Sequence, residues 1–262
     1  MKNECKNVCL SLIVILLTFS VGKTEPIVIQ DVPAYNWYHG CGPTSIAMVM
    51  GYWDLQGYSN LLQAEGDDLY LTEKVKDEIT SPQHIATNYP APYNPIYPVP
   101  PPNNTSIADW LGTSADGISL APNIIPAILG WTDYKGYEFQ ASGLKFSTTG
   151  SLLWSTLITE INNGRPMLFL VDSNGSGSTN HLVPAIGYED RGVNGLWYAV
   201  YTTWSENEVI SWYQYRKITS GNIFGVSTGF SIKPITQVPE PSVFLLIVML
   251  LPSIKFYWLW NR

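Results

Sequence analysis

Apolar residues recur at helical spacing in several parts of this chain. Between positions 44 and 53, large apolar residues stand three or four positions apart, and the same spacing returns between 151 and 161, before the helix-ending pair Asn163-Gly164. Each of these patterns predicts a helix with one buried face. Weaker patterns predict further helices, a polar one at 69–79 and two short ones at 107–111 and 123–129.

Most of the second half alternates between extended apolar runs and turn residues. Such runs predict β-strands, here at 137–146, 166–171, 181–188, 196–201, 209–215 and 223–232. A group of helices followed by an antiparallel sheet is an α+β arrangement. The many prolines between 88 and 104 exclude helix and internal strand and predict an extended surface loop, with a domain linker as the alternative.

The N-terminal segment, residues 1–22, has the features of a secretory signal peptide. Two lysines precede the apolar run Leu10 to Val21, and a small residue follows it. Removal of this segment takes away the first two of the three cysteines, and Cys41 is then the only thiol of the exported domain, which we expect at 24–236. A single cysteine in an oxidising compartment is either a partner for another chain or a reactive group.

The C-terminal segment, 238–262, carries Pro239-Glu240-Pro241, an apolar stretch and a terminal arginine. It resembles the PEP-CTERM sorting tail of Gram-negative bacteria. The resemblance implies export across the inner membrane, tethering through the tail, and cleavage by an exosortase, which leaves the domain at the cell surface or released. An ordinary membrane anchor is the alternative, and either one places the domain outside the cytoplasm.

Composition narrows the classes of partner and cofactor. The formal net charge is −7, which argues against nucleic acid or anionic lipid as a partner. The abundant aromatic residues suit a sizeable core, or in part a substrate groove. Three histidines and one remaining cysteine offer no zinc cluster, and the loop 172–180 lacks the acidic residue that closes a calcium loop. The sequence therefore implies no cofactor.

Cys41 lies in the run His39-Gly40-Cys41-Gly42-Pro43-Thr44-Ser45, directly before the first predicted helix. Pro43 suits a first helical turn. Unpaired N–H groups and the positive end of the helix dipole favour a thiolate at this position, so we expect a nucleophile with a pKa below about 8.5. The alternative is a small, buried structural cysteine in a tight turn.

A cysteine nucleophile needs an imidazole to accept the thiol proton. Of the three histidines, His181 opens a predicted strand far from Cys41 in sequence, the usual order for pairs that meet only in the fold. His39 is two residues from Cys41 and is expected to point away from it. His84 is expected in an exposed loop. His181 is therefore the candidate general base.

Several short motifs together resemble the bacterial papain-like cysteine peptidases related to the double-glycine leader peptidases of bacteriocin exporters. They span about residues 27–211 and are Val32-Pro33, the run around Cys41, Gly51-Tyr52-Trp53-Asp54, Gly164-Arg165-Pro166, Asn180-His181 and Ile186-Gly187-Tyr188. The resemblance implies a papain-like fold with the Cys-bearing helix packed on the sheet that carries the histidine. It also implies a nucleophile at Cys41 and a base at His181.

The chain departs from this family at two supporting positions. The oxyanion donor, usually a Gln shortly before the Cys, falls near Tyr35 or Asn36, and Asn36 is the candidate because Gln30 lies too far upstream. The residue that orients the histidine falls at Thr202, within Thr-Thr-Trp-Ser. Two acidic residues near it in sequence, at 190 and 206, are possible substitutes.

These features predict an exported, membrane-tethered cysteine peptidase that acts on a peptide or protein substrate through an acyl-enzyme at Cys41. The same pair could pass the acyl group to an amine, as a transamidase does. The departures at the supporting positions leave a third interpretation, a catalytically degenerate domain that binds peptide or exopolysaccharide at the cell surface.

Overall fold

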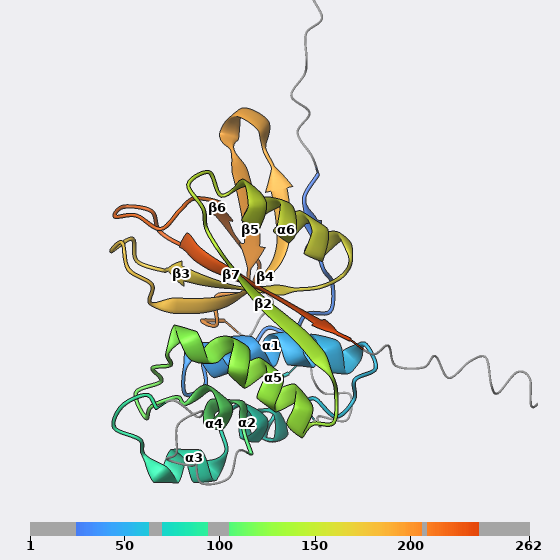
Figure 1. Cartoon of the computed structure of the whole chain (residues 1–262), viewed down its shortest axis with the longest axis vertical. Helices are drawn as coiled ribbons and strands as arrows, with labels where there is room; N and C mark the ends of the chain where they lie inside the picture. Colours follow the sequence, from blue (N-terminus) through green and yellow to red (C-terminus); the bar gives the residue numbers. More distant parts are fainter. Residues whose placement is uncertain (1–24, 63–69, 94–104, 206–208, 236–262) are drawn as a thin grey trace, which may run out of the picture.

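The chain folds into a helical half and a sheet half that meet along one helix (Figure 1). The computed structural model describes residues 25–62, 70–93, 105–205 and 209–235. The predicted signal peptide, the sorting tail, most of the proline-rich loop and residue 206 lie outside these ranges. The helices are α1 (Cys41–Leu55), α2 (Glu73–Ile79), α3 (Pro82–Thr87), α4 (Ile107–Leu111), α5 (Ile124–Tyr134) and α6 (Ser151–Asn162), with 3-10 turns at Ala121–Asn123 and Gly192–Asn194.

The sheet is antiparallel throughout and has seven strands. They are β1 (Ile27–Val28), β2 (Phe139–Lys145), β3 (Met167–Asp172), β4 (His181–Asp190), β5 (Leu196–Val200), β6 (Ser211–Gln214) and β7 (Gly225–Pro234). The order is β2-β7-β3-β4-β5-β6, and β1 pairs with β4 as well. This arrangement confirms the predicted α+β class, with the Cys-bearing helix packed against the strand that begins at His181.

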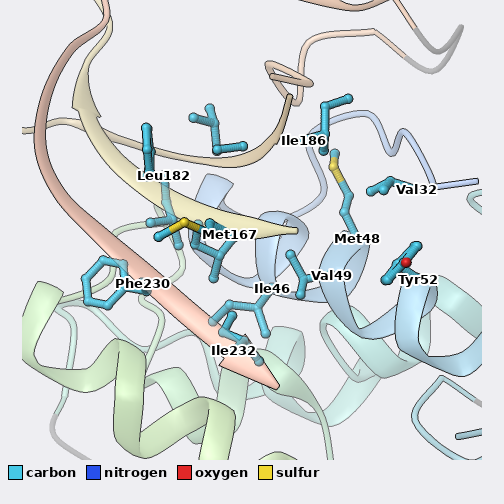
Figure 2. Close-up of a cluster of buried hydrophobic side chains, with 14 of the residues drawn as sticks. Val32, Ile46, Met48, Val49, Tyr52, Met167, Leu182, Ile186, Phe230 and Ile232 are labelled. Atoms are coloured by element: carbon cyan, nitrogen blue, oxygen red, sulfur yellow. The ribbon is translucent and has the colours of Figure 1, made fainter. Parts of the chain in front are cut away.

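Helix α1 is buried all round, and not on one face as its apolar spacing predicted. Every residue from Gly42 to Asp54 is buried, because β3 and β4 contact one side of the helix and α2 and α4 contact the other. Figure 2 shows Ile46, Met48 and Val49 of α1 in one cluster with side chains from the strands. A helix enclosed in this way holds its first residue, Cys41, in a fixed place between the two halves.

Helix α3, like the short strand β1, was not predicted from the sequence. Ser81 caps its N-terminus by accepting a hydrogen bond from the His84 N–H at 3.1 Å, and Pro82 occupies the first helical position. Ser followed by Pro is a recognised helix start, so the signal was present in the sequence. The expectation that His84 lies in an exposed loop was wrong, because α3 turns this side chain into the interior, where it is 4 % exposed.

Helix α6 belongs to the sheet half, where it packs on β1, β3 and β4. It ends where predicted, since Gly164 adopts a left-handed φ of 65° directly after it. The Gly164 carbonyl accepts a hydrogen bond from the Tyr52 hydroxyl at 2.5 Å, which ties α6 to the C-terminal part of α1. Among the described residues, no helix is both long enough and apolar enough to cross a membrane.

Candidate active site

Cys41 is the first residue of α1, and the glycines on either side of it allow a neighbouring loop to approach closely. A Cβ atom on Gly40 would lie 2.9 Å from the Gly117 carbonyl oxygen, and one on Gly42 would lie 2.7 Å from a methyl carbon of Leu111. Gly40 also adopts φ 135°, which other residues rarely do. The Gly-Cys-Gly sequence is therefore explained by the tight packing of residues 111–119 around the cysteine.

The two hydroxyl residues of the motif fix Cys41 from both sides. The Thr44 hydroxyl donates to the Gly40 carbonyl at 2.7 Å and accepts from the Tyr38 N–H at 3.1 Å, so it holds the turn that leads into the helix. The Ser45 hydroxyl donates to the Leu182 carbonyl at 2.7 Å and is fully buried. Because Leu182 follows His181 directly, this hydrogen bond ties the Cys-bearing helix to the His-bearing strand.

The thiol of Cys41 is in a more apolar setting than expected. Burial raises the pKa of Cys41, and hydrogen bonds from the backbone N–H groups of Leu182, Cys41 and Gly42 lower it by a smaller amount. The predicted lowering of this pKa took only the N–H groups of the helix start into account, and its direction was wrong. The sulfur atom nevertheless faces three N–H donors, one of which belongs to the residue after His181.

His181 begins β4 and uses one ring nitrogen to hold its position. Its Nε2 lies 2.8 Å from the main-chain carbonyl oxygen of Thr202. A carbonyl can only accept, so Nε2 carries the proton and Nδ1 keeps the lone pair that a general base requires. The imidazole is also 5 % exposed, and this burial lowers the pKa of His181, although the Thr202 carbonyl opposes the shift.

The orienting group is thus the backbone carbonyl of Thr202, the residue that the family motif had indicated. A main-chain carbonyl supplies the geometry without a negative charge. Two aromatic rings complete the enclosure of the imidazole: Trp204 stacks on it at 4.9 Å with the planes 16° apart, and Phe224 meets it edge-on at 6.1 Å. The imidazole is therefore held on its face, on its edge and at one nitrogen.

Cys41 and His181 line the same cavity, of about 210 Å³. One wall comes from Leu111, residues 117–121 and Ile124 of α5, and the other comes from Leu170 and residues 179–182. His181 is the only titratable residue of the lining besides Cys41. The wall that includes residues 117–121 was not predicted from the sequence. The turn glycines Gly112 and Gly117, both with left-handed φ values, were the sequence signal for this loop.

Asn36 lies on the loop before Cys41 but does not line this cavity. It is half-buried, and its Oδ1 accepts a hydrogen bond from the Trp37 N–H at 3.0 Å. The two other residues considered for the oxyanion donor are elsewhere. Tyr35 is fully buried in the core, and the amide of Gln30 donates to Val28 of the edge strand β1.

Two other titratable residues that were considered, His39 and Asp190, lie within the described ranges and do not line the cavity. His39 packs against the rings of Trp37 and Tyr38 and does not line the cavity. Asp190 is the last residue of β4, and at about 3.3 Å per residue it stands roughly 30 Å along the strand from His181. It cannot orient that imidazole.

His84 takes part in a buried structural pair. Its Nδ1 lies 2.7 Å from an Asp109 carboxylate oxygen and its Nε2 lies 2.8 Å from the Thr113 carbonyl. The other Asp109 oxygen accepts from the N–H and hydroxyl of Ser106, the N-cap residue of α4. This network joins α3 to α4 and to the cavity wall, since the Thr113 hydroxyl contacts that of Ser119 at 3.0 Å.

The loop 172–180, which was compared with a calcium site, is held together by hydrogen bonds to its own Asp172. Both carboxylate oxygens of Asp172 accept hydrogen bonds from the loop, from the N–H groups of Asn174 and Gly177 and from the Ser176 hydroxyl. Within the described ranges, no group of three or more His, Cys, Asp or Glu residues is placed to hold a metal ion.

A cysteine at the start of a buried helix and a histidine at the start of an antiparallel strand, both lining one cavity, are the arrangement of the papain-like thiol peptidase folds. The family model described as Peptidase_C39 like family matches residues 29–224. The chain therefore belongs to the C39-like peptidase family, and the matched segment contains both Cys41 and His181. A search of curated proteins finds no match.

Proposed function

We propose that this domain is a cysteine-type peptidase with Cys41 as nucleophile and His181 as general base. The observation that carries the proposal is that both side chains line one cavity, with the imidazole already oriented through Nε2 by the Thr202 carbonyl. Membership of a peptidase family supports peptide bonds as the substrate.

The pair rests in its neutral form. Burial raises the pKa of Cys41 and lowers that of His181, and both shifts favour thiol and imidazole over thiolate and imidazolium. Nδ1 of His181 therefore takes the thiol proton as the sulfur attacks the peptide carbonyl. The C–S bond forms, the carbonyl oxygen becomes an oxyanion, and the imidazolium then gives the proton to the departing amine.

The oxyanion needs hydrogen-bond donors that are in place before the reaction. The N–H of Cys41, at the start of α1, faces the sulfur. We assign the second donor to the side-chain amide of Asn36, which lies outside the cavity lining and has to turn toward the carbonyl oxygen when the substrate binds. Water, activated by the same imidazole, then hydrolyses the thioester. Transfer of the acyl group to an amine uses the same pair, so the class of acceptor has to be determined by product analysis.

Export and tethering belong to the same proposal. They rest on the signal-like segment 1–22 and on the resemblance of 238–262 to a PEP-CTERM tail. The proposed partners are an extracytoplasmic peptide or protein substrate, the membrane through the tail, and an exosortase-type enzyme that cleaves it. The acidic charge of the chain disfavours nucleic acid.

One observation favours the degenerate alternative, a domain that binds peptide without cutting it. The thiol pKa is raised, and the orienting group of His181 is a neutral carbonyl. The two functions differ in their response to loss of the sulfur, because binding does not require it.

The test is to incubate the full-length protein with a mixed peptide library and to follow new termini by mass spectrometry. Cys41→Ala should abolish cleavage, and Ser155→Ala, which changes an exposed hydroxyl on α6, should leave it unchanged. Cleavage that persists in Cys41→Ala would refute the peptidase proposal. Products extended by an added amine would instead identify a transamidase.

A further inference from the structure

Three consecutive residues, Thr202, Thr203 and Trp204, place His181 and connect it to the loop before Cys41. The Thr202 carbonyl accepts from Nε2 of His181 at 2.8 Å, and the Trp204 ring stacks on the same imidazole. Between them, the Thr203 carbonyl accepts a hydrogen bond from the Trp37 N–H at 2.6 Å. The segment therefore contacts the imidazole at its nitrogen and on its face, and is anchored at its middle residue.

Thr203 makes this arrangement possible through an unfavourable backbone conformation. Its φ is 65°, a left-handed value that is an outlier for a β-branched residue. The reversal turns the carbonyls of residues 202 and 203 toward different partners. The side chain is fully buried, and in the described part of the chain its hydroxyl has no hydrogen-bond partner.

Two unfavourable features thus coincide at one residue, next to the candidate general base. Backbone outliers of this kind persist only where the surroundings enforce them, and they concentrate at functional sites. Trp37 provides the enforcement here. Its N–H holds the Thr203 carbonyl, and its ring packs against Gly117 of the cavity wall, where an added Cβ would come within 2.7 Å of it.

We propose that Thr203 is a positioning residue, whose left-handed backbone, anchored by the Trp37 N–H, sets the imidazole of His181 for proton transfer with Cys41. The inference rests on the proposed function, because it assigns how the general base of that reaction is held. Thr203 itself does not touch the substrate in this account, and it acts only through the carbonyl and the ring on either side of it.

The groups around the imidazole make a simple readout possible. His181 faces the Thr202 carbonyl, the rings of Trp204 and Phe224, and the cavity that it shares with Cys41. The lining of that cavity contains no Lys, Arg, Asp or Glu. Any pH dependence of Cys41 reactivity that disappears in His181→Ala therefore reports proton transfer between these two residues.

The experiment measures the rate of Cys41 alkylation by iodoacetamide against pH in the full-length protein. A working pair gives a plateau of reactivity at neutral pH that depends on His181, followed by a second rise at alkaline pH. Thr203→Pro fixes φ near −65° and should lower the plateau by about 100-fold, the scale of a misplaced catalytic group. Thr203→Asn should keep it within about twofold, because Asn tolerates the left-handed region.

Asn88→Pro is the matched control, since Asn88 also has a left-handed φ, 49°, but lies at the end of α3. It should leave the plateau unchanged. If Thr203→Pro fails to fold, Trp37→Pro decides, because it removes the N–H that anchors the Thr203 carbonyl and should lower the plateau by about threefold to tenfold. A wild-type plateau in folded Thr203→Pro, or in Trp37→Pro where the variant at 203 does not fold, would overturn the inference alone. The absence of any His181-dependent plateau in the wild type would overturn the proposed function with it.

Discussion

The hydrogen bond from Ser45 to Leu182 offers a direct test of how the two halves are joined. It spans 137 positions in sequence, links α1 to β4, and is fully buried at the serine end. Ser45→Ala removes the donor and leaves a carbonyl in the core with one partner fewer. Loss of such a hydrogen bond costs about 1–3 kcal/mol, and the methyl group of alanine leaves almost no cavity.

We therefore expect Ser45→Ala to lower the free energy of unfolding by about 2 kcal/mol, measured by urea titration with circular dichroism. The neutral-pH alkylation rate of Cys41 should fall as well, because the bond joins the helix that begins at Cys41 to the strand that begins at His181. Ser155→Ala is the matched control. Its hydroxyl is exposed and donates to Leu152 within the same helix, and the change should stay within about 0.5 kcal/mol.

The reasoning would be refuted if Ser45→Ala unfolded at the same urea concentration as the wild type. It would also be refuted if stability fell but alkylation kept its wild-type rate and pH dependence. The first result would mean that the Leu182 carbonyl is equally well satisfied without Ser45. The second would mean that the hydrogen bond stabilises the fold without setting the geometry of the pair.

Three other substitutions test separate parts of the account. Trp204→Ala exposes His181 and should raise its lowered pKa toward 6.5, so the acid limb of the alkylation profile should move to higher pH; an unmoved limb would contradict the role given to burial. Asn36→Ala should lower kcat for peptide cleavage by about 100-fold with little change in KM, and an unchanged kcat would leave the oxyanion to main-chain donors alone. His84→Ala removes the buried partner of Asp109 and should lower the free energy of unfolding by about 3 kcal/mol in urea titration. An unfolding midpoint equal to that of the wild type would show that the pair does not stabilise the fold.

The elements that position Cys41 and His181 were largely predictable from sequence. The Gly-Cys-Gly-Pro run marked the start of α1, because proline is favoured in the first turn of a helix and this preference can be seen in the local sequence. The strand at His181 followed from its apolar run, and its length was underestimated only because Glu189 and Asp190 look like a turn. Both are in the strand, and Glu189 is paired with Arg191.

What the sequence could not supply depends on contacts between distant segments. The pKa of Cys41 is raised by burial in the assembled fold, and no local sequence pattern shows that burial. The hydrogen bond of His181 is accepted by a backbone carbonyl, which every residue has, so Thr202 could be located only through the family motif. The left-handed φ of Thr203 has no signal in a Thr-Thr-Trp sequence, because glycine or asparagine is the usual mark of that conformation.

The buried pair of His84 and Asp109 shows a different limit. The N-cap of α3 was visible in Ser81-Pro82, but the partner 25 positions away was not. From sequence, a histidine in a polar segment is predicted to be exposed. Only the fold places the Asp109 carboxylate and the Thr113 carbonyl against the ring of His84.

The central claim is that Cys41 and His181 form one proton-sharing pair whose resting state is neutral. The measurement is the rate of Cys41 alkylation by iodoacetamide from about pH 4 to 10, which spans the ordinary pKa values of both groups, in the wild type and in His181→Ala. The account predicts two steps in the wild type, a first rise below pH 6.5 as His181 becomes neutral and a second above about 8.5 for the thiol itself, with only the second left in the variant. A single step with the same midpoint in both proteins would contradict the account, because it would mean that the imidazole does not take the proton of the thiol.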